Sequence, residues 1–585
     1  MRKLSTLAVL SAGLFLAACG DKSLPPTSAV QTPQGAVIGK WNAKTNVANF
    51  MGLPFAQPPV GDLRWTTPSP APDFAQTFNA TEFGNRCMQP RGSEGGFIDS
   101  IVEGQGFSTA KEFIIKSAIA AMPSGDYSED CLYLNVRTPN VSQDGNVGDA
   151  PLPVMVWIHG GGHSFGSGDT GFYQSDELPQ KGVVLVTINY RLGAFGYMTH
   201  PALSADDARG VSGNYGLMDQ IAALNWVKDN IAAYGGDAEN VTIFGESAGG
   251  WSVTELMSAP AAKGLFHRAI GQSGASTYHL GDLTGNASTW PSGHEGGLKI
   301  AHGLGLADDV TAAQLRALPA SDFMDLLSMD AMIGEGLHPV RDGEVLPKNV
   351  GIAFRDADFH SVPTLFGYNA DEGTLFFPDD PQPTVWLDDF PRDGIAAQAA
   401  ALTPIFGAAA TDTILSQYGL SDPAAFMAAG TQLMGDEIFG VNVRYVTRQN
   451  AKAGSPSYLY AFTRVPPSKT QTLGAYHGAE IPFILGTLTA AFDPTKEDLA
   501  LKDMMQTYWV NFARTGNPNG EGLIEWPEHD GENWMIFGGN TGAPLAESQT
   551  GYRKVKIDAL ETGLLYHLDL ISPQSAPGSA AVGPQ

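Results

Sequence analysis

The pentapeptide Gly-Glu-Ser-Ala-Gly at 245–249 places a serine between two glycines. The apolar run 241–244 before it predicts a buried strand, and the apolar spacing from Ser247 to Met257 predicts a helix. A Gly-x-Ser-x-Gly turn between a strand and a helix lifts the serine hydroxyl clear of the sheet, where it can attack a carbonyl carbon. Glycine on both sides lets neighbouring backbone approach without a clash against a Cβ. We therefore predict that Ser247 is a nucleophile.

A second glycine run, His-Gly-Gly-Gly at 159–162, directly follows the apolar run 154–158. Attack on an ester carbonyl places negative charge on its oxygen, and each preorganised backbone N–H group stabilises that charge by about 3 kcal/mol. A glycine run exposes its N–H groups and bends freely. We predict an oxyanion hole formed by the N–H groups of Gly161, Gly162 and Ala248, the residue after the nucleophile.

A serine nucleophile needs a general base and an acid that orients the base. In folds with this turn, the chain order is serine, acid, histidine. The apolar run 362–366 predicts a later core strand, and Asp371 and Glu372 follow it closely. Both side chains are carboxylates at the expected place, and their chemistry alone does not choose between them.

The base must follow the acid in the chain, which leaves three of the twelve histidines: His477, His529 and His567. His529 stands in a polar stretch, Pro-Glu-His-Asp-Gly-Glu, that is typical of a solvated loop, and His567 is close to the C-terminal tail. His477 stands between Gly474 and Gly478, in a turn beside apolar residues. Chain order and context therefore predict His477 as the base.

The rest of the chain alternates between short apolar runs and helical patterns. A helix is predicted over 214–234, where apolar residues recur every three or four positions. The apolar runs are nearly continuous, as expected of parallel strands that are buried on both faces. The alternation predicts an α/β fold with a large, mostly parallel central sheet and helices on both faces, whose chemistry lies beyond the carboxyl ends of the strands. The runs lie at 154–158, 183–188, 241–244, 362–366 and 458–462.

Composition limits the partners that the chain can have. Its 585 residues include 34 Lys and Arg against 61 Asp and Glu, which gives a net charge of −27, and no run of basic residues occurs. Nucleic acid is not an expected partner, because phosphate binding needs clustered cations. Three cysteines argue against a zinc cluster. The predicted chemistry needs neither a metal nor a cofactor.

The N-terminus has the pattern of an export signal. Arg2 and Lys3 precede a short apolar run at 7–16. That run leads into Leu-Ala-Ala-Cys, which resembles the lipobox of bacterial lipoproteins and would make Cys19 the lipidated first residue of the mature protein. An ordinary signal peptide followed by a chance cysteine is the alternative. We expect an exported protein, periplasmic or at the cell surface, that is attached to a bacterial membrane only through its lipid.

These patterns divide the chain into four parts. We predict a signal peptide over 1–18, a lipidated cysteine and flexible tether over 19–33, and a low-complexity, disordered tail over 572–585. No repeat or linker interrupts the sequence between tether and tail. One large domain over 34–571 is therefore expected.

The chain resembles the type-B carboxylesterase family, which includes cholinesterases, bile-salt-activated lipase and bacterial ester hydrolases. Segments 129–136 (Glu-Asp-Cys-Leu-Tyr-Leu-Asn-Val) and 241–250 (Val-Thr-Ile-Phe-Gly-Glu-Ser-Ala-Gly-Gly) match two signatures of that family. The likeness extends from about residue 34 to residue 570. It implies an α/β-hydrolase fold.

The resemblance also implies roles for individual residues. Glu372 stands where the family has its catalytic acid, and His477 stands at the family's histidine. Ser273 matches a second serine that supports the acid. Cys87 and Cys131 match the family's first disulfide, with a longer loop between them than is usual.

Together these residues predict hydrolysis of a small-molecule carboxylic ester in two steps, through an acyl-enzyme on Ser247. A lipase that acts on aggregated lipid is a close alternative. A binding protein that has lost catalysis is a second alternative, which is disfavoured because Ser247, Glu372 and His477 are all present. The sequence indicates neither the acyl and alcohol groups of the ester nor the oligomeric state.

Overall fold

The computed structural model describes residues 24–90, 93–277, 280–285, 292–324, 337–376, 394–422, 424–465, 470–488 and 493–572. Its centre is an eleven-stranded sheet with the order β18-β17-β16-β15-β12-β11-β9-β10-β8-β4-β3. The strands from β17 to β10 run parallel to one another, and antiparallel strands extend both edges. The strands are β3 (Lys40–Asn42), β4 (Val47–Pro54), β8 (Tyr133–Thr138), β9 (Leu152–Ile158), β10 (Val184–Ile188), β11 (Gly236–Glu246), β12 (Arg268–Gln272), β15 (Thr364–Asn369), β16 (Ser457–Phe462), β17 (Asn533–Phe537) and β18 (Ala546–Thr550).

Alternate side chains of the central strands enter two separate cores. In β9, Val154, Val156 and Ile158 lie in one core, whereas Met155 and Trp157 lie in the other. Side chains alternate along a strand, so a strand that is covered on both faces must be apolar at successive positions. This explains the unbroken apolar run, and it confirms the predicted α/β fold with a large central sheet and helices on both faces.

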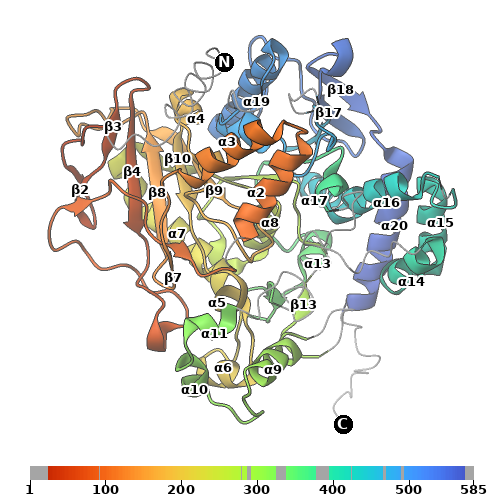
Figure 1. Cartoon of the computed structure of the whole chain (residues 1–585), viewed down its shortest axis with the longest axis horizontal. Helices are drawn as coiled ribbons and strands as arrows, with labels where there is room; N and C mark the ends of the chain where they lie inside the picture. The colour runs from red at the N-terminus through yellow and green to blue at the C-terminus, as the bar shows by residue number, and fades with distance from the viewer. Residues whose placement is uncertain are drawn as a thin grey trace, which may run out of the picture.

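Different helices contribute to the two cores (Figure 1). The longer helices of the first core are α7 (Tyr215–Asn230), α8 (Ala248–Ser258), α14 (Ile395–Phe406), α15 (Ala408–Tyr418), α17 (Val441–Lys452) and α20 (Lys554–Ile571). The second core lies under α4 (Glu177–Gln180), α18 (Ile481–Leu485) and α19 (Lys496–Thr515). The predicted helix over 214–234 is observed as α7 followed by a 3-10 turn at Ile231–Tyr234.

Shorter helices and small sheets complete the fold. Figure 1 shows a group of short helices at the lower end of the molecule. These helices are α5 (Gly193–Tyr197), α6 (Pro201–Asp206), α9 (Gly293–Gly303), α10 (Ala312–Arg316) and α11 (Ala320–Met324). Further elements are α13 (Val350–Arg355), α16 (Phe426–Gly435), and two two-stranded sheets, β6 (Arg86–Cys87) with β7 (Tyr127–Ser128) and β13 (Gly281–Asp282) with β14 (Val340–Arg341).

The folded part of the chain begins earlier than the sequence predicts. Strand β1 (Val30–Thr32) forms a three-stranded sheet with β2 (Gly35–Ile38) and β5 (Phe78–Asn79), and Val30 is buried in the first core. The tether predicted over 19–33 is therefore too long at its C-terminal end, because the apolar side chain of Val30 packs against the domain. The predicted signal peptide, Cys19 and all but the first residue of the predicted tail lie outside the described residues.

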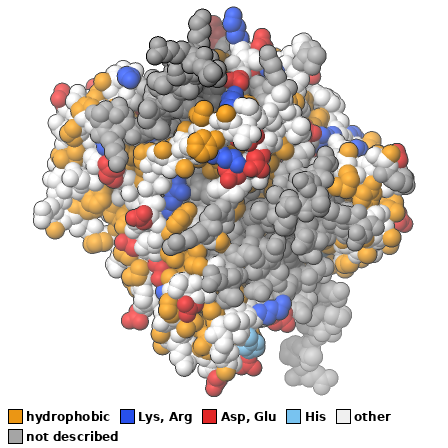
Figure 2. Space-filling view, viewed as in Figure 1, with side chains coloured by type: hydrophobic (Ala, Val, Ile, Leu, Met, Phe, Trp, Pro, Cys, Tyr) orange, Lys and Arg blue, Asp and Glu red, His pale blue; other side chains and the backbone are white. Residues whose placement is uncertain are grey.

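The described surface is mixed in character. Figure 2 shows hydrophobic, acidic and basic side chains interspersed on the face that it presents. Within the described ranges, every helix is too short or too polar to cross a membrane.

Candidate active site

Ser247 occupies a strained turn between β11 and α8. Its backbone has φ 58° and ψ −125°, a region that residues with a side chain rarely adopt. A Cβ added at Gly249 would lie 2.0 Å from the carbonyl oxygen of Ile158, and one added at Gly245 would lie 2.7 Å from the same atom. Only glycine fits at both positions, because the end of β9 passes so close. The strand–turn–helix context predicted for this motif is confirmed.

Glu372 and His477 come from different loops and meet in the interior. Glu372 begins a 3-10 turn after β15, and His477 lies between β16 and α18. The Glu372 Oε2 atom is 2.6 Å from His477 Nδ1, and Oε1 accepts a hydrogen bond of 2.6 Å from the backbone N–H of Asn369. Both side chains are buried, with exposed fractions of 1% and 3%. The imidazole therefore has a carboxylate fixed against its Nδ1 edge.

The other ring nitrogen of His477 faces Glu246. His477 Nε2 lies 3.2 Å from Glu246 Oε1, and the Ser247 hydroxyl makes no hydrogen bond to His477 within the described part of the chain. Ser247 and His477 nevertheless line the same cavity. Hydrogen bonds between catalytic groups often tighten only when a substrate is bound, so this arrangement is compatible with a nucleophile–base pair.

Two further carboxylates lie near the imidazole, and no sequence pattern marks them as part of the site. Glu246 is the second residue of the Gly-Glu-Ser-Ala-Gly motif, and Glu480 lies three residues after His477. Glu480 is completely buried and accepts hydrogen bonds from Gln272 Nε2 (3.0 Å) and Asn369 Nδ2 (2.6 Å). The only sequence signal was the position of each residue beside a predicted catalytic group.

These carboxylates set the charge state of the site. Burial alone would lower the pKa of His477, but Glu246, Glu372 and Glu480 outweigh it and raise that pKa above its usual value. Burial raises the pKa of Glu246, an effect that His477 partly opposes, and burial also raises the pKa of Glu480. The site therefore favours a positive imidazolium, which is the form that a base takes after it accepts a proton.

The glycine run at the end of β9 has N–H groups without a hydrogen-bond acceptor among the described residues. Gly161 and Gly162 have φ values of 101° and 59°, and a Cβ at Gly161 would lie 2.1 Å from the carbonyl oxygen of Phe165. Ala248 is the first residue of α8, where a helix leaves its N–H groups unsatisfied and carries partial positive charge. Within the described part of the chain, the N–H groups of Gly161, Gly162 and Ala248 donate to no protein acceptor. Gly161 lines the same cavity as Ser247, and the use of the three N–H groups by an oxyanion stays a prediction.

Asp371, the rival acid, joins the two loops instead of contacting the imidazole. Its Oδ2 atom accepts a hydrogen bond of 2.8 Å from the N–H of Ala475, and its own N–H donates to the carbonyl of Ala475 at 3.0 Å. Ala475 is two residues before His477. These two hydrogen bonds therefore join the loop that carries Glu372 to the loop that carries His477. The two rival histidines lie elsewhere: His529 Nδ1 is near the carbonyl of Asn533, and His567 Nδ1 is near that of Ile405.

One expectation differs from the observed position, and the role expected of Ser273 stays a prediction. The sequence predicts His529 in a solvated loop, but it is buried: its N–H donates to the carbonyl of Ser457 in β16 at 2.7 Å, and its Nδ1 lies 2.8 Å from the carbonyl of Asn533 in β17. Ser273 was expected to support the acid. Its hydroxyl is buried and has no hydrogen-bond partner in the described part of the chain, while its N–H donates to the carbonyl of Gly367 at 2.7 Å.

A mostly apolar cavity of about 80 Å³ opens at Ser247 and His477. Helix α2 (Ser93–Gly104), which with α3 (Thr109–Ala120) lies at the centre of Figure 1, forms part of its wall. The apolar lining comes mainly from Phe97, Ile98, Ile101, Phe165, Phe376 and Ile481. Such a lining suits an apolar group of a substrate.

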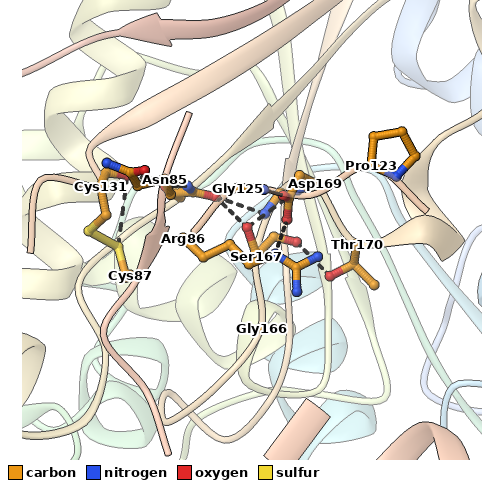
Figure 3. A network of polar contacts seen from close by, with 12 residues as sticks. Asn85, Arg86, Cys87, Pro123, Gly125, Cys131, Gly166, Ser167, Asp169 and Thr170 are labelled. Atoms are coloured by element: carbon orange, nitrogen blue, oxygen red, sulfur yellow. Dashed lines mark hydrogen bonds and ion pairs between the residues drawn. A yellow bond between two sulfur atoms is a disulfide. The ribbon is translucent and has the colours of Figure 1, made fainter. Parts of the chain in front are cut away.

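The loop that carries α2 is closed by the predicted disulfide. Cys87 and Cys131 are joined with an S–S distance of 2.09 Å, which confirms the pairing. A polar network supports the same region (Figure 3): Arg86 Nε is 2.7 Å from Asp169 Oδ1, and the N–H of Gly125 donates to Asp169 Oδ2 at 2.7 Å. Asp169 follows the glycine run 159–162 along the chain. Both ends of the disulfide loop are thus fixed relative to the cavity.

Comparisons with known proteins agree with this geometry. The profile described as "Carboxylesterase family" matches residues 26–553. Carboxylesterase 1E of Mus musculus is 35% identical over 569 residues, which cover 92% of this chain and 94% of that protein. The fumonisin B1 esterase of Sphingopyxis macrogoltabida is 35% identical over 529 residues, with coverage of 88% and 86%.

Solved structures give the same result. A carboxylesterase from Geobacillus stearothermophilus superimposes with a TM-score of 0.72 and 30% identity, and the match covers 91% of this chain and all of the other. This likeness agrees with the α/β-hydrolase fold observed for the central sheet and its helices. The chain belongs to the carboxylesterase family of carboxylic ester hydrolases.

Proposed function

We propose that this protein hydrolyses carboxylic esters with Ser247 as nucleophile, His477 as general base and Glu372 as the acid that orients the base. The observation that carries the proposal is the 2.6 Å contact between Glu372 Oε2 and His477 Nδ1, in a cavity that Ser247 also lines. The strained elbow supports it, because such turns expose a serine hydroxyl to substrate. The alternative, a binding protein without catalysis, has no use for this buried pair.

The reaction has two steps. His477 Nε2 takes the proton of the Ser247 hydroxyl while Oγ forms a bond to the carbonyl carbon. The N–H groups of Gly161, Gly162 and Ala248 hold the oxyanion, and His477 then gives the proton to the departing alcohol. Water repeats the sequence on the acyl-enzyme, which releases the acid and restores the serine.

The proposed substrate is a small, soluble ester with an apolar group beside the scissile bond. The small volume of the cavity and its aromatic and aliphatic lining support this class. A lipase that acts on aggregated lipid is the alternative. We expect kcat/KM to be highest for short p-nitrophenyl esters and to be much lower for emulsified long-chain triacylglycerol. The reverse order would favour the lipase.

Replacement of the nucleophile tests the mechanism. Ser247→Ala should lower kcat by several orders of magnitude, towards the 10⁶-fold loss known for triad nucleophiles. A fluorophosphonate should label Ser247 in the wild-type protein, as read by peptide mass spectrometry. An Ala variant that keeps wild-type turnover, with an unchanged melting temperature, would contradict the proposal.

We further propose that the enzyme is exported and anchored by a lipid on Cys19, and that residues after Cys19 form a tether that ends before β1. The support is the sequence alone, namely the charged start, the short apolar run and Leu-Ala-Ala-Cys. We propose a single domain that begins where this tether ends and extends to α20. A role for Ser273 in support of the acid also stays a proposal, because it rests on the resemblance alone.

A further inference from the structure

The face of the His477 ring is covered by Phe439. The two rings stack with centroids 4.6 Å apart and planes inclined by 24°. Phe439 has an exposed fraction of only 3%, and it is absent from the described residues that line the cavity. It therefore contacts the imidazole from the protein interior and not from the cavity.

Phe439 belongs to a π-helical turn, Asp436–Gly440, that lies between α16 and α17. Such turns are rare and occur frequently at functional sites, because the wider turn redirects the side chains that it carries. The turn also packs against the acid: a Cβ added at Gly435, the residue before it, would lie 2.9 Å from Glu372 Cβ. The backbone that carries Phe439 is thus in contact with the other partner of His477.

A buried aspartate holds this turn in place. Asp436 is fully buried, and its carboxylate accepts hydrogen bonds from Tyr368 Oη (2.9 Å), Tyr418 Oη (2.9 Å) and Arg553 Nη1 (2.7 Å). A buried charge is tolerated only when it is paired and hydrogen-bonded, and three donors meet that need. The donors come from β15, α15 and the start of α20, so the turn is tied to three elements.

The same cluster reaches the acid loop. Arg553 Nη2 donates a hydrogen bond of 2.9 Å to the carbonyl of Ala370, which is two residues before Glu372. One arginine therefore links the residue that supports the Phe439 turn with the loop that carries the acid. A displacement of this cluster would move both contacts of the imidazole.

We propose that Phe439 is a positioning residue that fixes the plane of the His477 ring. Asp436 and its three hydrogen-bond donors hold the turn that carries Phe439 in place. The inference rests on the proposed function of His477 as the base. The Glu372 hydrogen bond fixes one edge of the ring but leaves it free to tilt about that edge. A second ring stacked on its face prevents the tilt, and the aromatic face attracts the imidazolium that forms during the reaction.

The decisive variant is Phe439→Leu, which keeps an apolar side chain but removes the ring face. We expect kcat for p-nitrophenyl acetate to fall about 10- to 100-fold, as small displacements of catalytic groups do, with KM within about twofold of wild type. The acid limb of the kcat/KM profile should move to lower pH, because the imidazolium loses a stabilising contact. The titratable groups that face the ring, Glu246, Glu372 and Glu480, are unchanged.

Phe376→Leu is the matched control. Phe376 also contacts the His477 ring, at 5.2 Å and 51°, but it lines the cavity. Its replacement should therefore alter KM as well as kcat. Tyr418→Phe is a second, milder probe that removes one donor to Asp436 and should lower kcat less than Phe439→Leu does, again without a change in KM.

Melting temperatures and the fraction of Ser247 labelled by a fluorophosphonate show whether each variant is folded. Phe439→Leu and Tyr418→Phe enzymes that both keep wild-type kcat, or that raise KM alone, would overturn the inference. If Ser247→Ala is inactive in the same assay, that failure concerns Phe439 only. If Ser247→Ala is active, the proposed function itself fails.

Discussion

Replacement of Glu372 by Gln separates the two carboxylates that the sequence alone could not distinguish. Glu372 uses both oxygens: Oε2 contacts His477 Nδ1, and Oε1 accepts the N–H of Asn369. A glutamine has one acceptor oxygen. If that oxygen keeps the Asn369 contact, the amide NH₂ faces Nδ1, which must then be unprotonated, and the proton moves to Nε2. A ring in that tautomer cannot accept the proton of Ser247.

The expected loss in kcat/KM is about 10³- to 10⁴-fold, by analogy with the wrong-tautomer variant of another triad. This corresponds to about 4 to 5 kcal/mol of transition-state stabilisation. The loss of charge also lowers the pKa of His477, because Glu372 is one of the carboxylates that raise it. Whatever activity remains should therefore have its acid limb at lower pH than in the wild type.

The assay is hydrolysis of p-nitrophenyl acetate from pH 5 to 10, with Asp371→Asn as the matched control. Asp371→Asn makes the same change in charge one residue away, but it keeps an acceptor oxygen for the N–H of Ala475. We expect it to lose less than about tenfold. If Asp371→Asn were the more damaging change, or if the two losses were equal, the assignment of Glu372 as the acid would be refuted.

Three further predictions concern the surroundings of the triad and the N-terminus. Glu246→Gln removes a charge that raises the pKa of His477, so the acid limb of the kcat/KM profile should move to lower pH; an unchanged limb would show that Glu246 is already protonated in the free enzyme. Replacement of Cys87 and Cys131 by Ser opens a loop with a sequence separation of 44 residues, which should lower the free energy of unfolding by up to about 4 kcal/mol in urea titrations and should raise KM, because α2 lines the cavity. Cys19→Ser should abolish partition into detergent without a change in kcat, and mass spectrometry of the mature N-terminus should show a diacylated or triacylated Cys19 in the wild type; an unmodified Cys19 would contradict this.

The fold and the principal catalytic candidates could be predicted from the sequence because short, local residue patterns indicate them. A Gly-x-Ser-x-Gly motif after an apolar run specifies the elbow, since the close passage of Ile158 excludes any larger residue at Gly245 and Gly249. An unbroken apolar run specifies a strand that is buried on both faces. The glycine run at 159–162 is equally local. The residue pattern left Asp371 and Glu372 open, and only the family resemblance chose between them.

The remaining features depend on contacts between distant segments, which no local pattern records. Asp371 and Glu372 are distinguished by the groups that they contact. Asp371 contacts Ala475, which is more than a hundred positions away along the chain. The sequence around Phe439 is that of an ordinary core phenylalanine. Its proposed role is indicated only by the structure, in which the π-helical turn stacks its ring on that of His477. Val30 was assigned to the tether for a similar reason: a short apolar segment near a polar, Pro-rich stretch gives no sign of the sheet that it joins.

The carboxylates around His477 follow from one physical requirement. A base that becomes cationic in a buried site needs negative charge nearby, because burial alone disfavours the imidazolium. Glu372 supplies that charge at Nδ1, but a single carboxylate leaves Nε2 without a partner when no hydroxyl is bound to it. Glu246 fills that position at 3.2 Å, and burial raises its own pKa, so it can take up a proton and become neutral when the imidazole does. The cluster can thus hold its protons in more than one arrangement, and the proposed transfer of a proton from Ser247 to His477 depends on the arrangement in which the imidazole is neutral.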